Sequence, residues 1–232
     1  TGNPKGVMIS HDNLTWTTKT IVEMVRANSQ DRLISYLPLS HIAEQVVSLH
    51  SPIATGASSW FAENLDKLGD NLRDVHPTIF VGVPRVWEKI QEKMVAAGAQ
   101  NPPLKKKIAA WARKLGLQGG YADQENKSRP FLYFLANKLV FSKVKDKLGL
   151  DQCRLCMTTA APISLDTLEF FLSLGIPLCE VYGMSELTGP GTTSLPWRYK
   201  TGKAGFAITG TEIKLAEDKE ILFRGRSVFK GY

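Results

Sequence analysis

Residues 181–189 read Val-Tyr-Gly-Met-Ser-Glu-Leu-Thr-Gly and follow an apolar run, residues 176–179, that is typical of a buried strand. An aromatic ring, a glycine, a hydroxyl and a carboxylate thus emerge where a strand ends, the edge at which open α/β sheets bind ligands. An aromatic face can stack on a base, a glycine lets a backbone approach closely, and a carboxylate can bind Mg²⁺. The stretch predicts a nucleotide site; the alternative is a strand followed by a polar turn.

A second informative stretch opens the sequence, where residues 1–6 read Thr-Gly-Asn-Pro-Lys-Gly. A glycine-rich turn with one lysine can hold phosphate through backbone N–H groups and a mobile ammonium. The pattern is not a P-loop, because Lys5 precedes the second glycine and no G-x-x-x-x-G-K-[ST] occurs in the sequence. Its alternative interpretation is a surface turn.

Strand-like and helix-like segments alternate along most of the chain. Strands are expected at residues 6–9, 32–37, 58–61, 78–83, 154–159 and 177–182. Helices are expected at residues 13–27, 41–49, 65–75 and 165–174. Ser164 is expected to cap the last helix and Gly175 to end it. The alternation indicates βαβ units and predicts an α/β fold, with parallel sheets and flanking helices. Short strands at residues 212–215 and 220–223 predict a small β-rich lobe after Gly202.

The net charge of +7 is unevenly distributed. Residues 85–150 contain fourteen Lys and Arg against five Asp and Glu. Helices are expected there at residues 86–97, 104–115 and 131–148, with a Gly-rich polar break at residues 116–129. The last helix carries an apolar stripe beside cations. Three interpretations stay open: a solvated basic face, attraction to an anionic membrane surface, or recognition of CoA phosphates. Nucleic acid is not expected as a partner, because no nucleic-acid-binding motif accompanies the charge.

Composition sets further limits. A chain of 232 residues with 43% hydrophobic residues is long enough for one large domain or two lobes with a real core. No run reaches the ~18 apolar residues of a membrane-spanning helix. Three cysteines suggest a reducing compartment, so the expected localisation is cytoplasmic, with membrane association left open. Cys153 and Cys156 form a C-x-x-C without a second pair, which favours buried strand residues over zinc or redox chemistry.

In combination the motifs resemble those of the adenylate-forming enzymes: acyl-CoA synthetases, luciferases and peptide-synthetase adenylation domains. Residues 1–6 resemble the end of the family's phosphate loop, and residues 36–41, Tyr-Leu-Pro-Leu-Ser-His, its second core motif. Residues 159–162, Thr-Ala-Ala-Pro, resemble the turn against adenine, and residues 182–186 the adenine and magnesium motif. Residues 202–205, 220–225 and 229–232 resemble the closing part of the large domain. Residues 82–89, Gly-Val-Pro-Arg-Val-Trp-Glu-Lys, look like long-chain and bubblegum-type fatty acyl-CoA synthetases.

The resemblance implies an ATP-dependent ligase for long-chain fatty acids. The carboxylate attacks the α-phosphate of ATP to give an acyl-adenylate and pyrophosphate, and the CoA thiol then attacks the adenylate carbonyl and releases AMP. ATP, Mg²⁺ and CoA are therefore implied, with the fatty acid as the acyl substrate. Two alternatives stay open: an adenylation domain that activates an amino acid or another carboxylate, and a non-catalytic nucleotide- or lipid-binding fragment. Residues 82–89 and the basic helical region disfavour the amino-acid alternative.

The resemblance also assigns roles to residues. Glu186 is the expected magnesium ligand, and Ser185, where the family often has Thr, is expected to reach the α-phosphate. His41 is expected beside the reacting carboxylate; its alternative is a strand-end residue that bonds to backbone. The expected catalytic residues are Glu186, Ser185, His41 and Lys5. The expected nucleotide-binding residues are Thr1, Gly2, Lys5, Ala160, Ala161, Tyr182, Gly183, Met184 and Ser185, with Tyr182 stacked on adenine.

The motifs further imply that the chain is the central part of a larger enzyme. Residues 1–200 are expected to belong to the AMP-binding large domain, with a basic helical insertion at about residues 85–150. Residues 201–232 are expected to begin a β-rich subdomain. The N-terminal part, a ribose-binding Asp and a C-terminal domain with a catalytic Lys are expected to lie outside this sequence. Arg85 and Trp87 are expected to pack within the domain.

Overall fold

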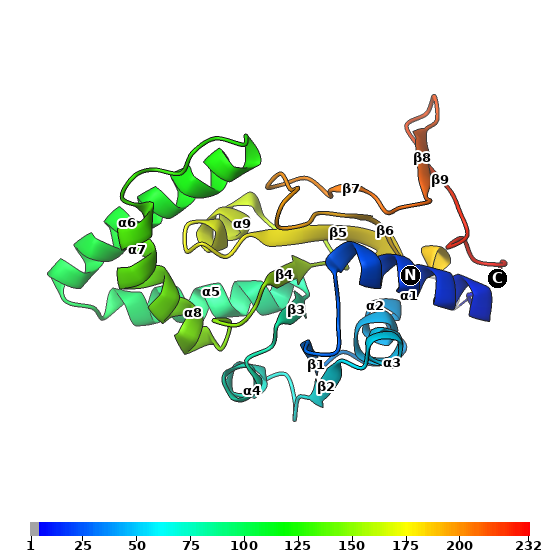
Figure 1. Cartoon of the computed structure of the whole chain (residues 1–232), viewed down its shortest axis with the longest axis horizontal. Coiled ribbons are helices and arrows are strands. Elements are labelled where there is room, and N and C mark those ends of the chain that lie inside the picture. Colours follow the sequence, from blue (N-terminus) through cyan, green and yellow to red (C-terminus); the bar gives the residue numbers. More distant parts are fainter. Residues whose placement is uncertain (1–4) are drawn as a thin grey trace.

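A computed structural model describes residues 5–232, and its centre is a five-stranded sheet with helices on both faces (Figure 1). The strand order is β3-β4-β5-β6-β7. Three parallel strands, β3 (Ile79–Gly82), β4 (Leu155–Thr158) and β5 (Leu178–Met184), are followed by antiparallel β6 (Gly189–Thr193) and β7 (Phe206–Ala207). The predicted α/β fold with parallel strands is therefore confirmed.

The parallel strands are apolar on both faces because helices cover both. On one face, Phe80, Cys156 and Leu178 pack in a cluster with α5 (Pro84–Ala99) and α9 (Leu165–Leu172). On the other face, Val81, Met157 and their neighbours pack against α1 (His11–Val25). Side chains alternate between faces along a strand, so each strand contributes to both clusters. Ser164 caps α9 by accepting a hydrogen bond from the Thr167 N–H at 3.1 Å, as predicted.

A second, two-stranded parallel sheet lies beside β3. It contains β1 (Arg32–Ser35) and β2 (Ser58–Phe61), joined by α2 (Ile42–Glu44), the wider π-helical turn η1 (Gln45–His50) and α3 (Ser51–Thr55). Helix α4 (Leu68–Val75) connects it to β3. The two sheets meet at buried Asp31, which accepts hydrogen bonds from Thr78 at 2.6 Å and Arg154 at 2.7 Å.

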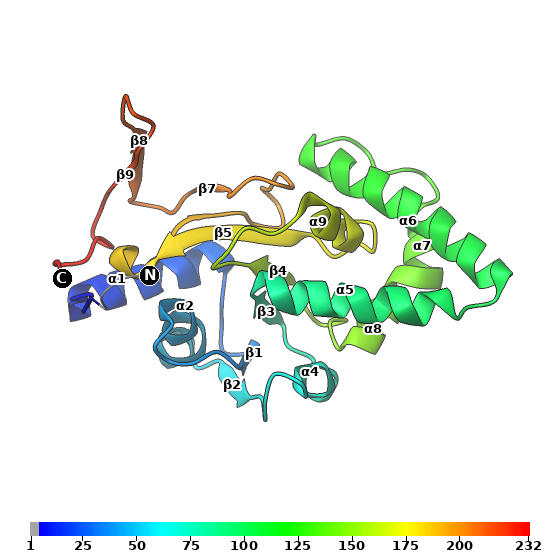
Figure 2. The ribbon, with the colours of Figure 1, turned by 180° about the vertical axis from the view of Figure 1, so that it is seen from behind.

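The basic region forms the end of the molecule farthest from the N- and C-terminal segments in both ribbon views (Figures 1 and 2). After α5 come α6 (Pro103–Gln124) and a continuous helical stretch of α7 (Tyr133–Ala136), η2 (Asn137–Phe141) and α8 (Ser142–Leu148). Trp87 is fully buried, and its indole N–H donates to the Met157 carbonyl at 3.0 Å, as expected of a packing residue. The same expectation was wrong for Arg85, which is exposed and ion-paired with Glu88 and Glu92.

The predicted break at residues 116–129 was wrong in its first half, because α6 continues to Gln124. Its glycines are sites of close packing. A Cβ at Gly116 would lie 2.0 Å from the Ser173 carbonyl oxygen, and one at Gly120 would lie 2.3 Å from a Leu172 methyl carbon. Glycine therefore lets α6 approach α9, at a cost in helix propensity that tertiary contacts offset.

The predicted strand at residues 6–9 was also wrong. This segment belongs to no strand, and its backbone hydrogen bonds within residues 5–232 are Met8 N–H to Gly231 O at 2.9 Å and Lys230 N–H to Met8 O at 2.8 Å. Its partner is the C-terminal strap, defined here as residues 226–232. Asn13, in the first turn of α1, also donates to the Arg226 and Val228 carbonyls in the strap.

Between β7 and the strap, the two predicted short strands are present as β8 (Glu212–Leu215) and β9 (Ile221–Arg224), and they pair as an antiparallel hairpin. The hairpin projects from the body of the molecule in both ribbon views (Figures 1 and 2). The domain boundary near residue 200 stays a prediction.

Candidate nucleotide site

A cavity of about 410 Å³ opens at the carboxyl ends of β3, β4 and β5, the edge at which open α/β sheets bind ligands. The segment after β1, the turn after β4 and the motif that spans the end of β5 all contribute to its wall. Six of the predicted site residues line it: His41, Ala160, Gly183, Met184, Ser185 and Glu186. Residues far apart in the sequence thus meet around one space.

The remaining predicted residues do not line this cavity. Ala161 is exposed, and Tyr182 lies in β5 between Val181 and Gly183, which both line the cavity. Lys5 is exposed, and its ammonium lies 4.7 Å from the centre of the Tyr232 ring. Thr1 and Gly2 lie outside the described residues.

The motif after β5 is held in place by the C-terminal strap. β5 ends at Met184, and the single turn η3 (Ser185–Leu187) reverses the chain into β6. Thr188 closes that turn with φ of 55°, a left-handed conformation that β-branched residues rarely adopt. Its buried hydroxyl donates to the Ser227 carbonyl at 2.7 Å. The strap therefore stabilises the backbone that presents Ser185 and Glu186.

Glu186 is a half-buried carboxylate next to the cavity. Its Oε1 accepts a hydrogen bond from the Tyr232 hydroxyl at 2.9 Å, which raises the pKa of that phenol. Residues 5–232 contain no group of three or more His, Cys, Asp or Glu that would enclose a metal. A single carboxylate nevertheless suits Mg²⁺, which binds through one or two carboxylates together with phosphates and water. The site therefore fits a magnesium ion that arrives with a nucleotide.

His41 is positioned by backbone. It is the N-cap of α2, and its Nδ1 accepts a hydrogen bond from the Ala43 N–H at 3.2 Å. With Nδ1 as the acceptor, the neutral ring carries its proton on Nε2 and can donate it to a ligand in the cavity. The structure thus combines both interpretations of His41, as a residue that bonds to backbone and as a residue at the site.

Glu44 is a residue that the sequence interpretation missed. It is buried three positions after His41 and accepts hydrogen bonds from the Ser35 hydroxyl and, at 3.3 Å, from the Leu37 N–H. These bonds join the start of the segment that leads from β1 to His41 to the helix that follows His41. The sequence offers little signal for this role, because Glu44 is followed by polar Gln45 and the pair is typical of the solvent-facing side of a helix.

Two small residues shape the site. Ala160 lines the cavity with φ of 77°, a left-handed conformation that L-residues other than glycine avoid. Gly183 has a packing reason for lacking a side chain: a Cβ there would lie 2.2 Å from the Gly189 carbonyl oxygen on β6. Close approach of β6 therefore requires Gly183, whether or not a ligand also approaches it.

Tyr182 has an aromatic neighbour that the sequence did not indicate. Its ring is 37% exposed and stacks on Phe223 of the hairpin, with ring centres 6.0 Å apart and planes 15° apart. One face of Tyr182 is therefore covered by β9. Stacking on a base would use the other face, and this role for Tyr182 stays a prediction.

The three cysteines are free thiols. Cys156 and Cys179 are buried in β4 and β5, while Cys153 precedes β4 and is half-buried. The hydrogen bond to Cys153 and burial raise the pKa of the Cys156 thiol, and burial raises that of Cys179 to about 12. Protonated thiols are poor nucleophiles and metal ligands. The expected role as a buried strand residue is confirmed for Cys156, but it was wrong for Cys153, which is half-buried and precedes β4.

The whole chain, residues 1–232, matches the family described as "AMP-binding enzyme". It is 48% identical to the long-chain-fatty-acid–CoA ligase ACSBG2 of Xenopus laevis and covers 33% of that protein. It is 39% identical to the long-chain-fatty-acid–CoA ligase ACSBG1 of Rattus norvegicus, of which it covers 34%. All of this chain is aligned in both comparisons, so it spans about a third of the length of these relatives.

Solved structures show the same fold. The O-succinylbenzoate coenzyme A synthetase MenE from Bacillus subtilis, in complex with ATP and magnesium ion, aligns with a TM-score of 0.68 at 19% identity. The alignment covers 100% of this chain and 40% of MenE. Apo MatB from Rhodopseudomonas palustris aligns with a TM-score of 0.66 at 22% identity, over 100% of this chain and 39% of MatB.

Proposed function

The chain belongs to the AMP-binding enzyme family, and we propose that it carries the acyl-adenylate site of a long-chain fatty acid–CoA ligase. The proposed reaction activates the fatty acid with ATP and then transfers the acyl group to CoA. The observation that supports it most directly is the 410 Å³ cavity that brings His41, Ala160, Ser185 and Glu186 together at the sheet edge. ATP and CoA are proposed co-substrates and Mg²⁺ the proposed metal.

In this proposal the residues mainly position groups and offset phosphate charge. Glu186 would hold the magnesium ion that accompanies the phosphates, and the Ser185 hydroxyl would donate to the α-phosphate. The Nε2–H of His41 would donate to an oxygen of the reacting carboxylate. Ala160 leaves room for the base, Tyr182 would stack on it, and Lys5 with Thr1 and Gly2 would contact the β- and γ-phosphates.

A long-chain fatty acid is preferred over an amino acid as the acyl substrate. The similar curated proteins of frog and rat are both named long-chain-fatty-acid–CoA ligases. The inner wall of the cavity is also aliphatic, with Ile21, Val46, Val47 and Met157 among its residues. An alkyl chain suits such a wall, whereas an α-ammonium group would need a polar partner there.

The test is calorimetric titration of the 232-residue chain with a non-hydrolysable long-chain acyl-adenylate analogue, with and without Mg²⁺. Micromolar binding is expected, together with a loss of about tenfold in Ala160→Trp, whose side chain would fill the cavity. Titration with an ATP analogue should lose its Mg²⁺ dependence in Glu186→Gln. A folded chain that does not bind the adenylate analogue would contradict the proposal.

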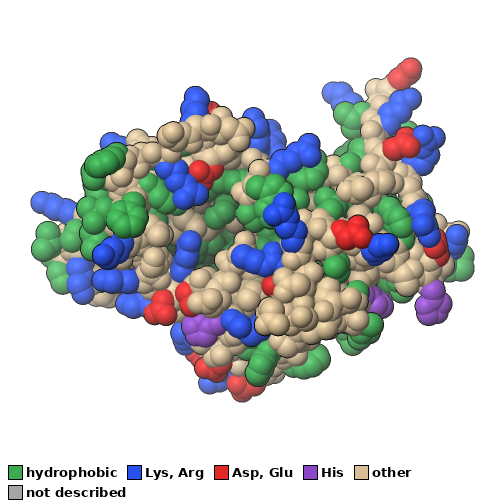
Figure 3. Space-filling model, in the orientation of Figure 1, with side chains coloured by type: hydrophobic (Ala, Val, Ile, Leu, Met, Phe, Trp, Pro, Cys, Tyr) green, Lys and Arg blue, Asp and Glu red, His purple; other side chains and the backbone are tan. Residues whose placement is uncertain are grey.

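We further propose a cytoplasmic location with peripheral contact to anionic membranes. The contact is supported by what we call the Phe131 patch, the exposed apolar side chains before and along α7 and η2. Phe131 is 96% exposed and Phe134 73%, and Leu135 and Leu139 are exposed beside them. Exposed Lys138 and Lys143 lie on the same helical stretch, and Figure 3 shows hydrophobic and basic side chains together at this end. No helix among the described residues is long and apolar enough to cross a membrane.

A further inference from the structure

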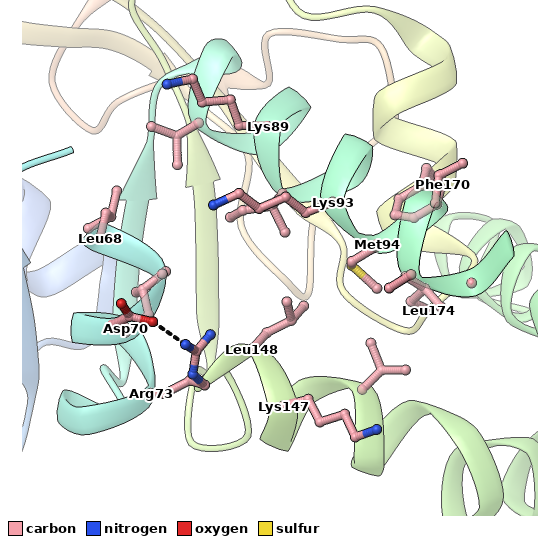
Figure 4. Close-up of a pocket in the computed structure, with 18 of the residues that line it drawn as sticks. Leu68, Asp70, Arg73, Lys89, Lys93, Met94, Lys147, Leu148, Phe170 and Leu174 are labelled. Carbon is pink, nitrogen blue, oxygen red and sulfur yellow. Dashed lines mark hydrogen bonds and ion pairs between the residues drawn. The ribbon is translucent and has the colours of Figure 1, made fainter. Parts of the chain in front are cut away.

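A second and larger cavity, of about 940 Å³, is lined by residues of α4, α5 and α8 and by further residues of α6 and α9; Figure 4 shows part of this lining. It shares no lining residue with the nucleotide cavity. Pockets that hold small molecules commonly measure roughly 300–1,000 Å³, so this cavity is large enough for one elongated ligand.

The floor of the second cavity is aliphatic. It is formed by Leu68 and Leu72 of α4, Ile90 and Met94 of α5, Leu148 of α8, and Leu174. The aromatic side chain in its wall is Phe170, whose ring lies 4.8 Å from the Arg113 guanidinium. Such a floor suits an alkyl chain, since it offers neither an open aromatic face for a base nor polar groups for a sugar.

The rim of the cavity is cationic. Lys89 and Lys93 lie on successive turns of α5, so they share one face of that helix. Figure 4 shows both side chains directed toward the gap between α5 and α4, with Lys147 on the α8 side. None of these three lysines has an ion-pair partner among residues 5–232, whereas Asp70 is paired with Arg73 and Lys67. Asp66 also lines the cavity without an ion-pair partner among the described residues, but the three lysines outnumber it, so the unpaired charge is positive on balance.

We propose that this cavity binds a long-chain fatty acid as its carboxylate, separately from the adenylate site. The alkyl chain would lie on the aliphatic floor, where burial of each CH₂ contributes about 0.8 kcal/mol in transfer terms. The carboxylate would lie at the mouth between Lys89 and Lys93, which supply charge-assisted hydrogen bonds. An apolar floor with cations at one end complements a ligand with one anionic head and one saturated tail.

The test is calorimetric titration of the 232-residue chain with palmitate below its self-association concentration, while the acyl-adenylate analogue saturates the nucleotide cavity. Palmitate is expected to bind, and the double variant Lys89→Met/Lys93→Met to bind it about tenfold more weakly. The matched control is Lys105→Met/Lys107→Met, which removes two exposed α6 charges outside the cavity and should leave the affinity unchanged. Methyl palmitate, which has no carboxylate, should bind to the wild-type chain more weakly than palmitate does. Its affinity should be the same for the wild-type chain and both double variants.

A third variant tests the floor independently of charge. Met94→Trp places a larger ring in the cavity and is expected to weaken palmitate and methyl palmitate alike. Equal palmitate affinity in the wild-type and Lys89→Met/Lys93→Met chains would overturn the proposal, as would complete displacement of palmitate by the analogue. Tighter binding of palmitoyl-CoA or anionic vesicles through the same lysines would assign the cavity to another ligand. Failure of the analogue to bind would count against the proposed function alone, since the lysine comparison still decides this site.

Discussion

Among single residues, Ala160 has a backbone conformation that its own side chain disfavours. A left-handed alanine costs about 1 kcal/mol, because its Cβ crowds the following carbonyl. Ala160→Gly is therefore expected to raise the free energy of unfolding by about 1 kcal/mol in urea denaturation. Ala161→Gly is the matched control: φ of Ala161 is not positive, so the change should lower stability by up to about 1 kcal/mol through chain entropy. Equal effects at the two positions would contradict this explanation.

Asp31 predicts a pH dependence of stability. Burial acts to raise its pKa, but hydrogen bonds from Arg154, Thr78 and the Asn28 N–H outweigh burial and lower it below 3.8. A carboxyl whose pKa is lower in the folded state stabilises the fold above its unfolded pKa, and this contribution is lost as pH falls through the folded pKa. Asp31→Asn is expected to cost about 2 kcal/mol at pH 7.

The measurement for Asp31 is denaturant unfolding of both proteins at pH 7 and below pH 3.8. The difference between wild type and variant should begin to shrink below pH 3.8, where the unfolded carboxyl takes up a proton, and should shrink further as pH falls through the lower pKa of the folded state. Asp70→Asn, at an exposed ion pair, is the control and should cost less than about 0.5 kcal/mol at either pH. A cost for Asp31→Asn that does not change with pH would contradict the assignment.

The sequence allowed the clustering of several candidate site residues to be predicted because motif residues follow strands. Carboxyl ends of adjacent parallel strands meet at one edge, so Ala160 after β4 and Ser185 after β5 had to lie close together. Phe223 against Tyr182 was not predictable, since it depends on how the hairpin folds back over β5. Glu44 was missed because one carboxylate in a helical pattern ordinarily faces solvent, and only the fold shows that Ser35 and Leu37 enclose it.

Among the elements, α6 shows where local pattern fails. The glycines that suggested a chain break instead pack against α9, and such a choice depends on a neighbour distant in sequence. β3, β4 and β5 were predictable because they are apolar on both faces, whereas residues 6–9 have a strand-like composition but no strand beside them. The apolar pattern therefore identified β3, β4 and β5. It missed the second half of α6, whose glycines are explained only by the close approach of α9.

Gly116→Ala tests the close packing of α6. Its Cβ would meet the Ser173 carbonyl oxygen, which cannot rotate away, so a loss of about 2 kcal/mol in unfolding free energy is expected. Gly98→Ala in α5 is the control, because no atom lies within 4 Å of a Cβ there and the change should add about 0.8 kcal/mol through helix propensity. Thermal or urea unfolding of both variants gives the comparison. Stabilisation by Gly116→Ala would show that α6 is not held this closely.

At the scale of the whole molecule, the Phe131 patch predicts binding to anionic vesicles. Phe131→Ser/Phe134→Ser should weaken co-sedimentation with phosphatidylserine-containing vesicles by more than tenfold, since burying one Phe contributes about 1.5 kcal/mol or more. Phe61→Ser is the control, because Phe61 is 77% exposed at the end of β2, outside the patch. Binding should also weaken with added salt, through the lysines. Equal vesicle binding by the wild type, Phe131→Ser/Phe134→Ser and Phe61→Ser would show that the Phe131 patch is not a membrane contact.

The C-terminal strap has a mechanical consequence. Residues 5–8 and 229–232 lie together, joined through Met8, while Glu186 holds both the Phe229 N–H and the Tyr232 hydroxyl. A force that pulls residues 5 and 232 apart would break these hydrogen bonds one after another. The hydrogen bonds between neighbouring strands of the central sheet would instead bear such a force together. The strap would therefore detach at low force with the sheet intact, and the first contacts to yield would be those that Tyr232 makes with the Lys5 ammonium and the Glu186 carboxylate.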